Sequence, residues 1–354
     1  MRDIFVHPAG QDDNLGDSAL RVGLLQALRG EAMRLHVHLD GQSSDYLAGV
    51  PLRKGELYPV RRDWISASQK VQRPVFVINA GEINPRPGVS FPNAQQASEL
   101  SSAVRRGGTV VATGIGLKDP SVAGEVNFVH VLREAAIVSW RDHGSRDAAG
   151  FGDVAPDWAF ALGSPTSDWM PRDARRFIAV TLRFDRPWPD DQWFVGLREL
   201  AAQTGATLVT VAQVARDQPR AVQLADVLGC DYIVAASTRH DDLDKLVRSV
   251  YSGAVAVVSD RAHALIMGAT EGAYPIGSAA DPGKIRRLLD TAGIGMLTGH
   301  YNDLTQHAAH LEEAYTHLPV AIRNARQELS ALTARIHSVT SIGESLPDGK
   351  ESAS

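Results

Sequence analysis

The residues whose types and spacing best suit ligand binding and proton transfer lie at positions 254–277, in AVAVVSDRAHALIMGATEGAYPIG. The β-branched opening of this stretch predicts a buried strand, and Ser259 or Asp260 is expected to cap the helix that follows. Arg261 and His263 would then lie in the first helical turn, at the carboxyl end of a strand, where open α/β sheets bind ligands. Together, the site would bind an anionic ligand and donate a proton to it, through free N–H groups, a guanidinium fork and an imidazole. A surface arginine and a hydrogen-bonded core histidine would also fit these two residues.

A polar loop near the amino terminus contains Asn14, Gly16 and Asp17, between the first predicted strand and the helix 18–29. Such a loop is where a Rossmann-like domain makes ligand contacts, but it lacks the GxGxxG pattern and does not predict a dinucleotide site. Asn, Gly and Asp are also ordinary turn residues. Asp17 or Ser18 is expected to cap the helix.

Further polar loops follow the other predicted strands of this half. Glu82 follows PVFVIN, GIGLKD follows the next strand, and RDHGSRD, with Arg141, follows IVSW. Glu82 could equally be a structural hydrogen-bonding residue, and Arg141 could pair with Asp142 or Asp147. His143 could be a second proton-transfer group or a surface loop residue.

Two other expectations concern ordinary secondary structure in the first half. His36 and His38 lie on the polar face of the predicted strand 35–39, so we expect them to face solvent. Residues 121–133 are expected to be helical.

The second half repeats the alternation of strands and helices. Arg183 ends its first strand, 177–182, and could bind a ligand or pair with Asp185. Pro282 opens a basic helix in which Lys284 could reach a phosphate or stay solvated.

This alternation predicts an α/β fold: two Rossmann-like domains with parallel sheets facing a central cleft, followed by a long C-terminal helix. The Pro-, Ser- and Gly-rich segment 162–172 marks the boundary. We expect an N-terminal domain at 1–165, a C-terminal domain at 174–300, a helix at 301–340 and a disordered tail at 341–354.

Composition bounds the class of protein. The chain has 354 residues and a formal net charge of -5, which gives no general attraction to nucleic acid or anionic lipid. Cys230 is the only cysteine, so an intramolecular disulfide or a cysteine zinc cluster is excluded. The start of the chain lacks a signal-peptide core, and no apolar run reaches membrane-spanning length. We expect a cytoplasmic protein.

Five segments, taken in order, resemble the polysaccharide pyruvyl transferase family: NLGDSAL, NAGE, VVATGIGLKD, VSWRDHGS and VSDRAHALIMGATEGAYPIG. The similarity runs from about residue 4 to about residue 295. Ala80 stands where the family usually has glycine, and Ala262 where leucine is common.

The resemblance implies a fold similar to the GT-B glycosyltransferases and transfer of a pyruvyl group from phosphoenolpyruvate to a sugar of a cell-surface or exopolysaccharide precursor. The product would be a ketal on two hydroxyls, and the chemistry implies no cofactor and no metal. The N-terminal domain would face the acceptor and the C-terminal domain the donor. The expected catalytic residues are His263, Arg261 and Arg183, and the expected substrate-binding residues are Asn14, Gly16, Asp17, Glu82, Arg141, Ser145 and Lys284.

Two other functions fit the same segments. A GT-B enzyme using a nucleotide-sugar would place Glu271 and Pro275 near the ribose and the sugar, and a degenerate relative would bind glycans without catalysis. The expected partners are phosphoenolpyruvate and a saccharide or lipid-linked oligosaccharide, with no nucleic acid. A lipid-linked acceptor would draw the protein to the inner membrane face. The sequence is compatible with a homo-oligomer and does not decide the oligomeric state.

Overall fold

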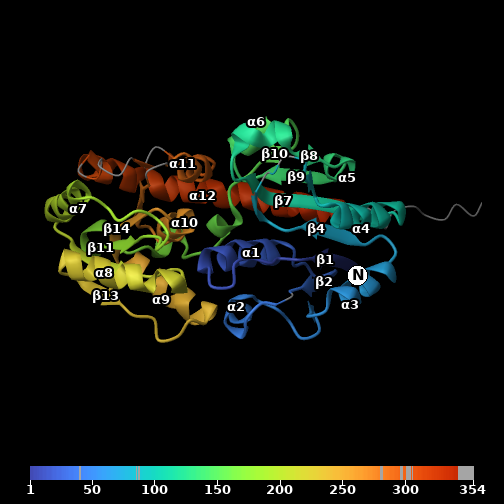
Figure 1. Cartoon of the computed structure of the whole chain (residues 1–354), viewed down its shortest axis with the longest axis horizontal. Helices are drawn as coiled ribbons and strands as arrows, with labels where there is room; N and C mark the ends of the chain where they lie inside the picture. The colour runs from blue at the N-terminus through green and yellow to red at the C-terminus, as the bar shows by residue number, and fades with distance from the viewer. Residues whose placement is uncertain are drawn as a thin grey trace, which may run out of the picture.

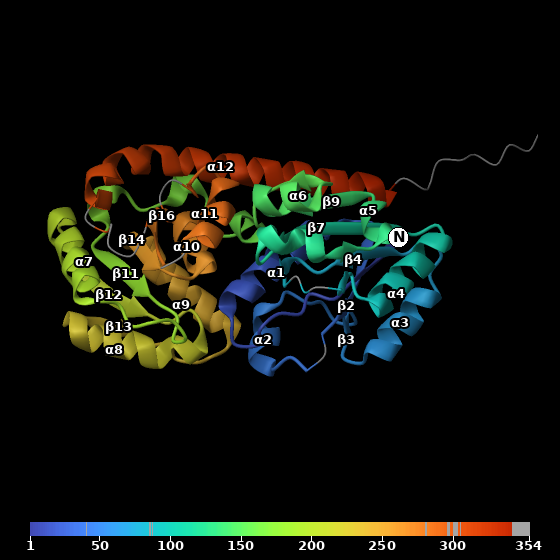
Figure 2. The same ribbon diagram turned by 45° about the horizontal axis from the view of Figure 1, so that its top comes forward.

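Two α/β domains lie side by side, and one long helix runs across both of them (Figure 1). Figure 2 shows this helix, α12 (Gln306–Ser341), covering one side of the molecule from the second domain back to the first. The computed structural model describes residues 1–39, 41–84, 86, 88–279, 282–295, 298–299, 304 and 306–341.

The first domain is built on a parallel sheet in the order β10-β9-β7-β4-β1-β2-β3, with β5 paired to β7. Its strands are β1 (Arg2–Val6), β2 (Met33–His38), β3 (Leu57–Tyr58), β4 (Val75–Ile78), β5 (Gly81–Ile83), β7 (Thr109–Leu117), β9 (Ile137–Trp140) and β10 (Asp153–Val154). Its α-helices are α1 (Leu15–Ala27), α2 (Ser44–Gly49), α3 (Arg61–Gln69), α4 (Ala94–Arg105), α5 (His130–Arg133) and α6 (His143–Ala149). A separate parallel pair joins β6 (Ser90–Phe91) to β8 (Asn127–Phe128).

The second domain has a parallel sheet in the order β13-β12-β11-β14-β15-β16. Its strands are β11 (Phe177–Thr181), β12 (Thr207–Val211), β13 (Asp231–Ile233), β14 (Ala254–Ser259), β15 (Tyr274–Ser278) and β16 (Thr298–Gly299). Its helices are α7 (Asp191–Thr204), α8 (Gln218–Leu228), α9 (His240–Ser252), α10 (Ala262–Thr270) and α11 (Gly283–Asp290). All six residues of β14 are buried, as expected for a strand covered on both faces. The predicted α/β architecture is therefore confirmed.

Helix α12 ties the two domains together through side-chain hydrogen bonds. The Tyr315 hydroxyl donates to the carbonyl of Val255 in the second domain. Arg326 donates to the carbonyls of Phe160 and Leu162 at 3.2 and 2.6 Å, and His337 Nε2 lies 2.9 Å from the carbonyl of Ala27 in the first domain. No helix in the described part of the chain is long and apolar enough to cross a membrane. Most of the predicted tail, 342–354, lies outside the described residues.

The expectation that His36 and His38 face solvent is wrong. Both are buried, because β3 and its Tyr58 cover the outer edge of β2. His36 Nδ1 lies 2.9 Å from the Tyr58 hydroxyl and its Nε2 lies 2.7 Å from Asp3. His38 Nδ1 donates to the Tyr58 carbonyl at 2.8 Å. The polar face of the strand is paired instead of solvated, which the alternation of residue types alone does not reveal.

The predicted helix at 121–133 is also wrong. The segment forms a 3₁₀ helix (Pro120–Glu125), then β8, then the single turn α5. Val126 and Phe128 are buried, and Phe128 stacks edge-on against Trp140. The extended stretch buries these two side chains against the sheet, which a continuous helix would not do.

The fit of α1 against the loop after β10 generates a stability prediction. A Cβ atom added at Gly23 would lie 2.2 Å from the backbone oxygen of Trp158, which cannot move without shifting the chain. We expect Gly23→Ala to lower the free energy of unfolding by about 2 kcal/mol, even though alanine favours the helix itself. Urea unfolding measures this loss. Gly124→Ala, where nothing lies within 4 Å, is the control, and equal midpoints for both variants would contradict the packing described.

Candidate active site

A cleft of about 670 Å³ lies between the domains, at the carboxyl ends of both parallel sheets. Eight of the ten predicted site residues line it, and Gly16 and Ser145 do not. The first domain contributes Gln11, Asn14, Asp17, Arg21, Glu82, Lys118 and Arg141. The second contributes Arg183, Arg186, Pro187, Gln213, Asp260, Arg261, Ala262, His263, Ala279, Lys284, Ile285 and Leu288.

The side chains that line the cleft are cationic more often than acidic, although the whole chain is acidic. Seven arginine and lysine side chains line the cleft against three carboxylates, those of Asp17, Glu82 and Asp260. Such a local excess of positive charge in a concave site attracts anions. The arrangement therefore suits a small molecule that carries phosphate or carboxylate groups.

A buried carboxylate joins the two walls of the cleft. Asp157 is fully buried, and its Oδ2 lies 3.3 Å from Arg141 Nη1 and 3.5 Å from His263 Nε2. Its other oxygen accepts the N–H of Ala159 at 3.0 Å. Burial by itself raises the pKa of Asp157, but His263 and Arg141 outweigh that effect and lower it to about 2. Asp157 thus stays ionised, paired with Arg141 and facing the imidazole of His263.

The sequence did not indicate Asp157, and for Arg141 it left open an ion pair with Asp142 or Asp147. Asp157 follows the two-residue strand β10 in APDW, a pattern too short to stand out. Arg141 pairs with Asp157 and, at 3.8 Å, with Glu82, instead of Asp142 or Asp147.

The start of α1 touches His263 directly. The helix begins at Leu15, and its cap is Asn14, whose Oδ1 accepts the N–H of Gly16 at 3.1 Å; the predicted caps Asp17 and Ser18 are therefore wrong. A Cβ atom at Gly16 would lie 2.5 Å from Cβ of His263. Because glycine has no Cβ atom, Gly16 permits this close approach between the domains.

Arg261 is held in place by a second buried acid. Its Nε and Nη2 both bond to the carboxylate of Asp217, with Nη2 to Oδ1 at 2.9 Å. Arg261 is the residue directly before α10 and occupies the cap position, so the prediction that Ser259 or Asp260 caps this helix is wrong. Ser259 Oγ accepts the N–H of Arg261 at 2.9 Å. The guanidinium lines the cleft, and within the described residues its Nη1 has no protein partner.

Two further cations in the cleft also have acidic partners. Arg183 binds Asp185 through Nε and Nη2 at 2.8 and 2.7 Å, the ion pair that the sequence allowed. Lys284 contacts Glu82 across the cleft. Burial lowers the pKa of Lys284, while Glu82 acts in the opposite direction.

Ser145 lies behind the cleft wall, with its polar groups engaged. Its Oγ donates to Asp142 at 2.6 Å and accepts the N–H of Leu117 at 2.7 Å, and Asp142 caps α6. His143 is exposed at the first position of α6 and does not line the cleft. Ser145 therefore supports the loop that carries Arg141.

Asp260 also lines the cleft, although the sequence indicated it only as a possible helix cap. Its Oδ1 accepts the N–H of Arg183 at 2.9 Å, and its Oδ2 is buried without a hydrogen-bond partner among the described residues. Burial raises the pKa of Asp260 to about 6, against the lowering effects of Arg183 and Arg261. A carboxyl group that titrates near neutral pH inside a ligand cleft is suited to proton transfer.

The residues expected to hold a nucleotide lie elsewhere. Glu271 is buried away from the cleft, where Arg248 donates to it at 2.9 Å and Ser164 at 2.7 Å. Pro275 lies within the buried strand β15. Among the residues that the structure describes, no group of three or more His, Cys, Asp or Glu side chains is arranged to hold a metal ion.

Comparison with known proteins identifies the fold and nothing finer. No family model and no curated protein matches the chain. A putative UDP-N-acetylglucosamine 2-epimerase from Listeria monocytogenes superposes with a TM-score of 0.58 at 10% identity, covering 96% of each chain. UDP-GlcNAc 2-epimerase from Neisseria meningitidis, bound to UDP-GlcNAc, gives 0.57 at 9% identity and covers 96% of this chain and 100% of its own. Anabaena Alr3699/HepE in complex with UDP gives 0.55 at 12%, covering 96% and 99%.

These similarities establish a GT-B-type architecture, as predicted. None of these three structures is named as a pyruvyl transferase, so the family resemblance stays a prediction.

Proposed function

We propose that this protein transfers the pyruvyl group of phosphoenolpyruvate to a sugar and forms a pyruvate ketal. One observation carries the proposal: the polar residues of the family-like segments meet in a single cationic cleft. Asn14, Asp17, Glu82 and Arg141 come from one domain, and the Arg261–His263 segment comes from the other.

The cleft provides for both anionic groups of such a donor. Phosphate and carboxylate are each bound well by guanidinium forks. Arg261 offers Nη1 from a side chain held rigid by Asp217, and the half-buried Arg183 can exchange its Asp185 partner for ligand oxygens. Lys284 adds a point charge at the same wall.

The reaction needs one proton delivered to carbon. His263 protonates the methylene carbon of the enol, and a sugar hydroxyl bonds to the adjacent carbon. The bond between that carbon and the phosphate oxygen then breaks, and a second hydroxyl closes the ketal. Of the two hydroxyl protons, one replaces the proton lost by His263 and the other leaves on phosphate.

The carboxylates in and beside the cleft have different roles in these steps. Asp157 stays ionised through the neutral range, and its Oδ2, 3.5 Å from His263 Nε2, can orient the imidazole. Asp17 and Glu82 lie on the acceptor wall and can take the hydroxyl proton. Asp260 can hand a proton to the departing phosphate.

A second candidate is a transferase or epimerase that uses a nucleotide-sugar. It is favoured by the shared fold with proteins whose structures contain UDP or UDP-GlcNAc. The position of Glu271, paired with Arg248 outside the cleft, gives it no support. A third candidate is a relative that binds glycans without turnover.

Ligand-induced stabilisation distinguishes these functions. We expect phosphoenolpyruvate to raise the melting temperature, with about 2.7 kcal/mol of stabilisation at a hundredfold excess over its Kd. UDP-GlcNAc and UDP-glucose should have little effect. Phosphate release should require both phosphoenolpyruvate and a saccharide. Stabilisation by the UDP-sugars alone would favour the second candidate, and saccharide binding without phosphate release the third.

Removing the imidazole tests its role in proton transfer. We expect His263→Gln to lower the rate of phosphate release at least about 100-fold, because general acids contribute factors of this size. The Kd for phosphoenolpyruvate should change far less. His130→Ala, at a histidine whose side chain is 81% exposed, is the matched control and should keep full activity. Near-normal turnover of His263→Gln would exclude this residue as the acid.

Asp260 generates a stability prediction that depends on pH. Its pKa is raised from 3.8 to about 6 in the folded protein, so the folded state holds a proton that the unfolded state has lost between these values. Ionising it costs stability as pH rises from about 4 to about 6, by up to about 3 kcal/mol. Asp260→Asn should therefore gain stability over the parent at pH 8 but not at pH 4. Melting curves at both values test this, with the exposed Asp226→Asn as control.

A further inference from the structure

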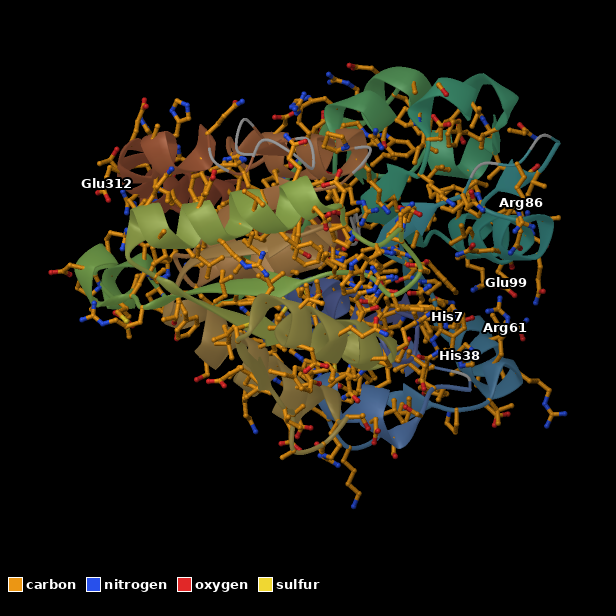
Figure 3. The ribbon with its side chains drawn as sticks, turned by 60° about the vertical axis from the view of Figure 1, so that its left-hand side comes forward. His7, His38, Arg61, Arg86, Glu99 and Glu312 are labelled. Carbon is orange, nitrogen blue, oxygen red and sulfur yellow. The ribbon has the colours of Figure 1, made fainter. Side chains whose placement is uncertain are left out.

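A second hollow, of about 310 Å³, lies within the first domain at the carboxyl edge of its sheet. It sits where α3 and α4 begin, above β1 and β4. In Figure 3, Arg61 and Glu99 lie close together, with His7 beside them. The pocket is lined by His7, Arg61, Trp64, Phe76, Val77, Asn93, Gln95, Gln96, Glu99 and Leu100.

The topology of the sheet puts this pocket near a position where open parallel sheets commonly bind ligands. β1 and β4 are neighbours, but the chain leaves β1 toward β2 on one side and leaves β4 toward β7 on the other. The crevice at such a switch point is the usual ligand site of an open parallel sheet. The pocket therefore lies at the same switch point as the first-domain wall of the interdomain cleft.

Two short chain segments connect the pocket to the cleft. His7, after β1, lines the pocket, and Gln11, four residues later, lines the cleft. Val77 in β4 lines the pocket, and Glu82, five residues later, lines the cleft. Extended chains of these lengths span at most about 14 to 18 Å. Lining residues of the two hollows therefore lie within a distance comparable to the length of a few linked sugar units.

The chemistry of the pocket differs from that of the cleft. Arg61 Nη2 and Glu99 Oε2 pair at 2.5 Å, so their charges cancel, and Gln95 donates to the other Glu99 oxygen at 3.3 Å. The remaining polar lining includes the amides of Asn93 and Gln96. Neutral amides and a paired arginine offer many donors and acceptors without attracting an anion.

The floor and one wall of the pocket are fixed. Trp64 is 4% exposed and donates through its indole N–H to the carbonyl of His36, and it packs edge-on against Phe76. His7 Nδ1 lies 2.7 Å from the carbonyl of His38. An apolar floor under a ring of planar polar groups suits the hydroxyls and C–H faces of a neutral sugar.

We propose that this pocket is a subsite for a sugar unit of the acceptor, and that the acceptor is an oligosaccharide whose terminal sugar reaches into the cleft. The proposal rests on the proposed function, because it takes the cleft as the place where that terminal sugar reacts. The two hollows differ in charge and would therefore bind different ligands. The cationic cleft would bind the anionic donor, and the neutral pocket would bind the uncharged part of the acceptor.

The test measures saccharide binding without any donor. Titration calorimetry uses a panel of linear di-, tri- and tetrasaccharides of glucose, galactose, mannose and N-acetylglucosamine, with the four monosaccharides. At least one oligosaccharide should bind about tenfold or more tighter than any monosaccharide. The double variant Arg61→Met/Glu99→Gln should remove most of that gain, because it deletes the ion pair but keeps side-chain size. Arg62→Met, at a neighbouring arginine whose side chain is 92% exposed, is the matched control.

Amide hydrogen exchange then locates the bound sugar. An oligosaccharide should protect residues 61–64 and 93–96, which a monosaccharide should not. Equal affinity for both sizes, no binding by the panel, or unchanged binding by the double variant would overturn the proposal. If the pocket binds oligosaccharides and no phosphate is released from phosphoenolpyruvate, the proposed function fails and the subsite stands. If phosphate is released with monosaccharides and oligosaccharides at equal KM, the subsite fails and the function stands.

Discussion

The carboxylate of Asp157 is the interaction on which the candidate site depends. It is fully buried, and it faces Arg141 from its own domain and His263 from the other. A buried charge is tolerated only when it is paired and hydrogen-bonded, and separating the domains here would leave the carboxylate with Arg141 and the N–H of Ala159 but without His263. The same contact that stabilises the interface therefore sets the position of the imidazole in the cleft.

Other contacts hold the domains at one separation and so define the size of the cleft. Asn14 pairs with Val214 as an isolated antiparallel bridge, and Arg216 Nε donates to Asp13 at 2.6 Å. His240 Nδ1 lies 2.8 Å from the Ser18 hydroxyl inside the seam. Helix α12 braces the other side (Figure 2). Because α1 starts inside this seam, the loop that caps it also lines the cleft.

The cations of the cleft are held by acids of graded exposure. The pair of Arg261 and Asp217 is buried, with side chains 9% and 1% exposed, whereas Arg183 and Asp185 are 33% and 41% exposed. A buried pair is costly to separate and gives a preorganised donor, while a partly solvated pair exchanges partners readily. The cleft thus combines a rigid anion contact with an adaptable one, next to an uncharged pocket in the first domain.

The sequence by itself determined the architecture and eight of the nineteen residues that line the cleft. Apolar β-branched runs, capping residues and glycine stops mark strands and helices locally, and parallel strands bring their polar carboxyl ends to one edge. That is why Arg141, Arg183 and His263 could be placed at strand ends before the structure was known. Tertiary structure alone decided which groups face one another: Asp157 against His263, Tyr58 over His36, and Glu271 turned away from the cleft. These pairings join residues 22 to 106 positions apart, and no local pattern encodes them, because burial and charge compensation depend on how separate elements pack.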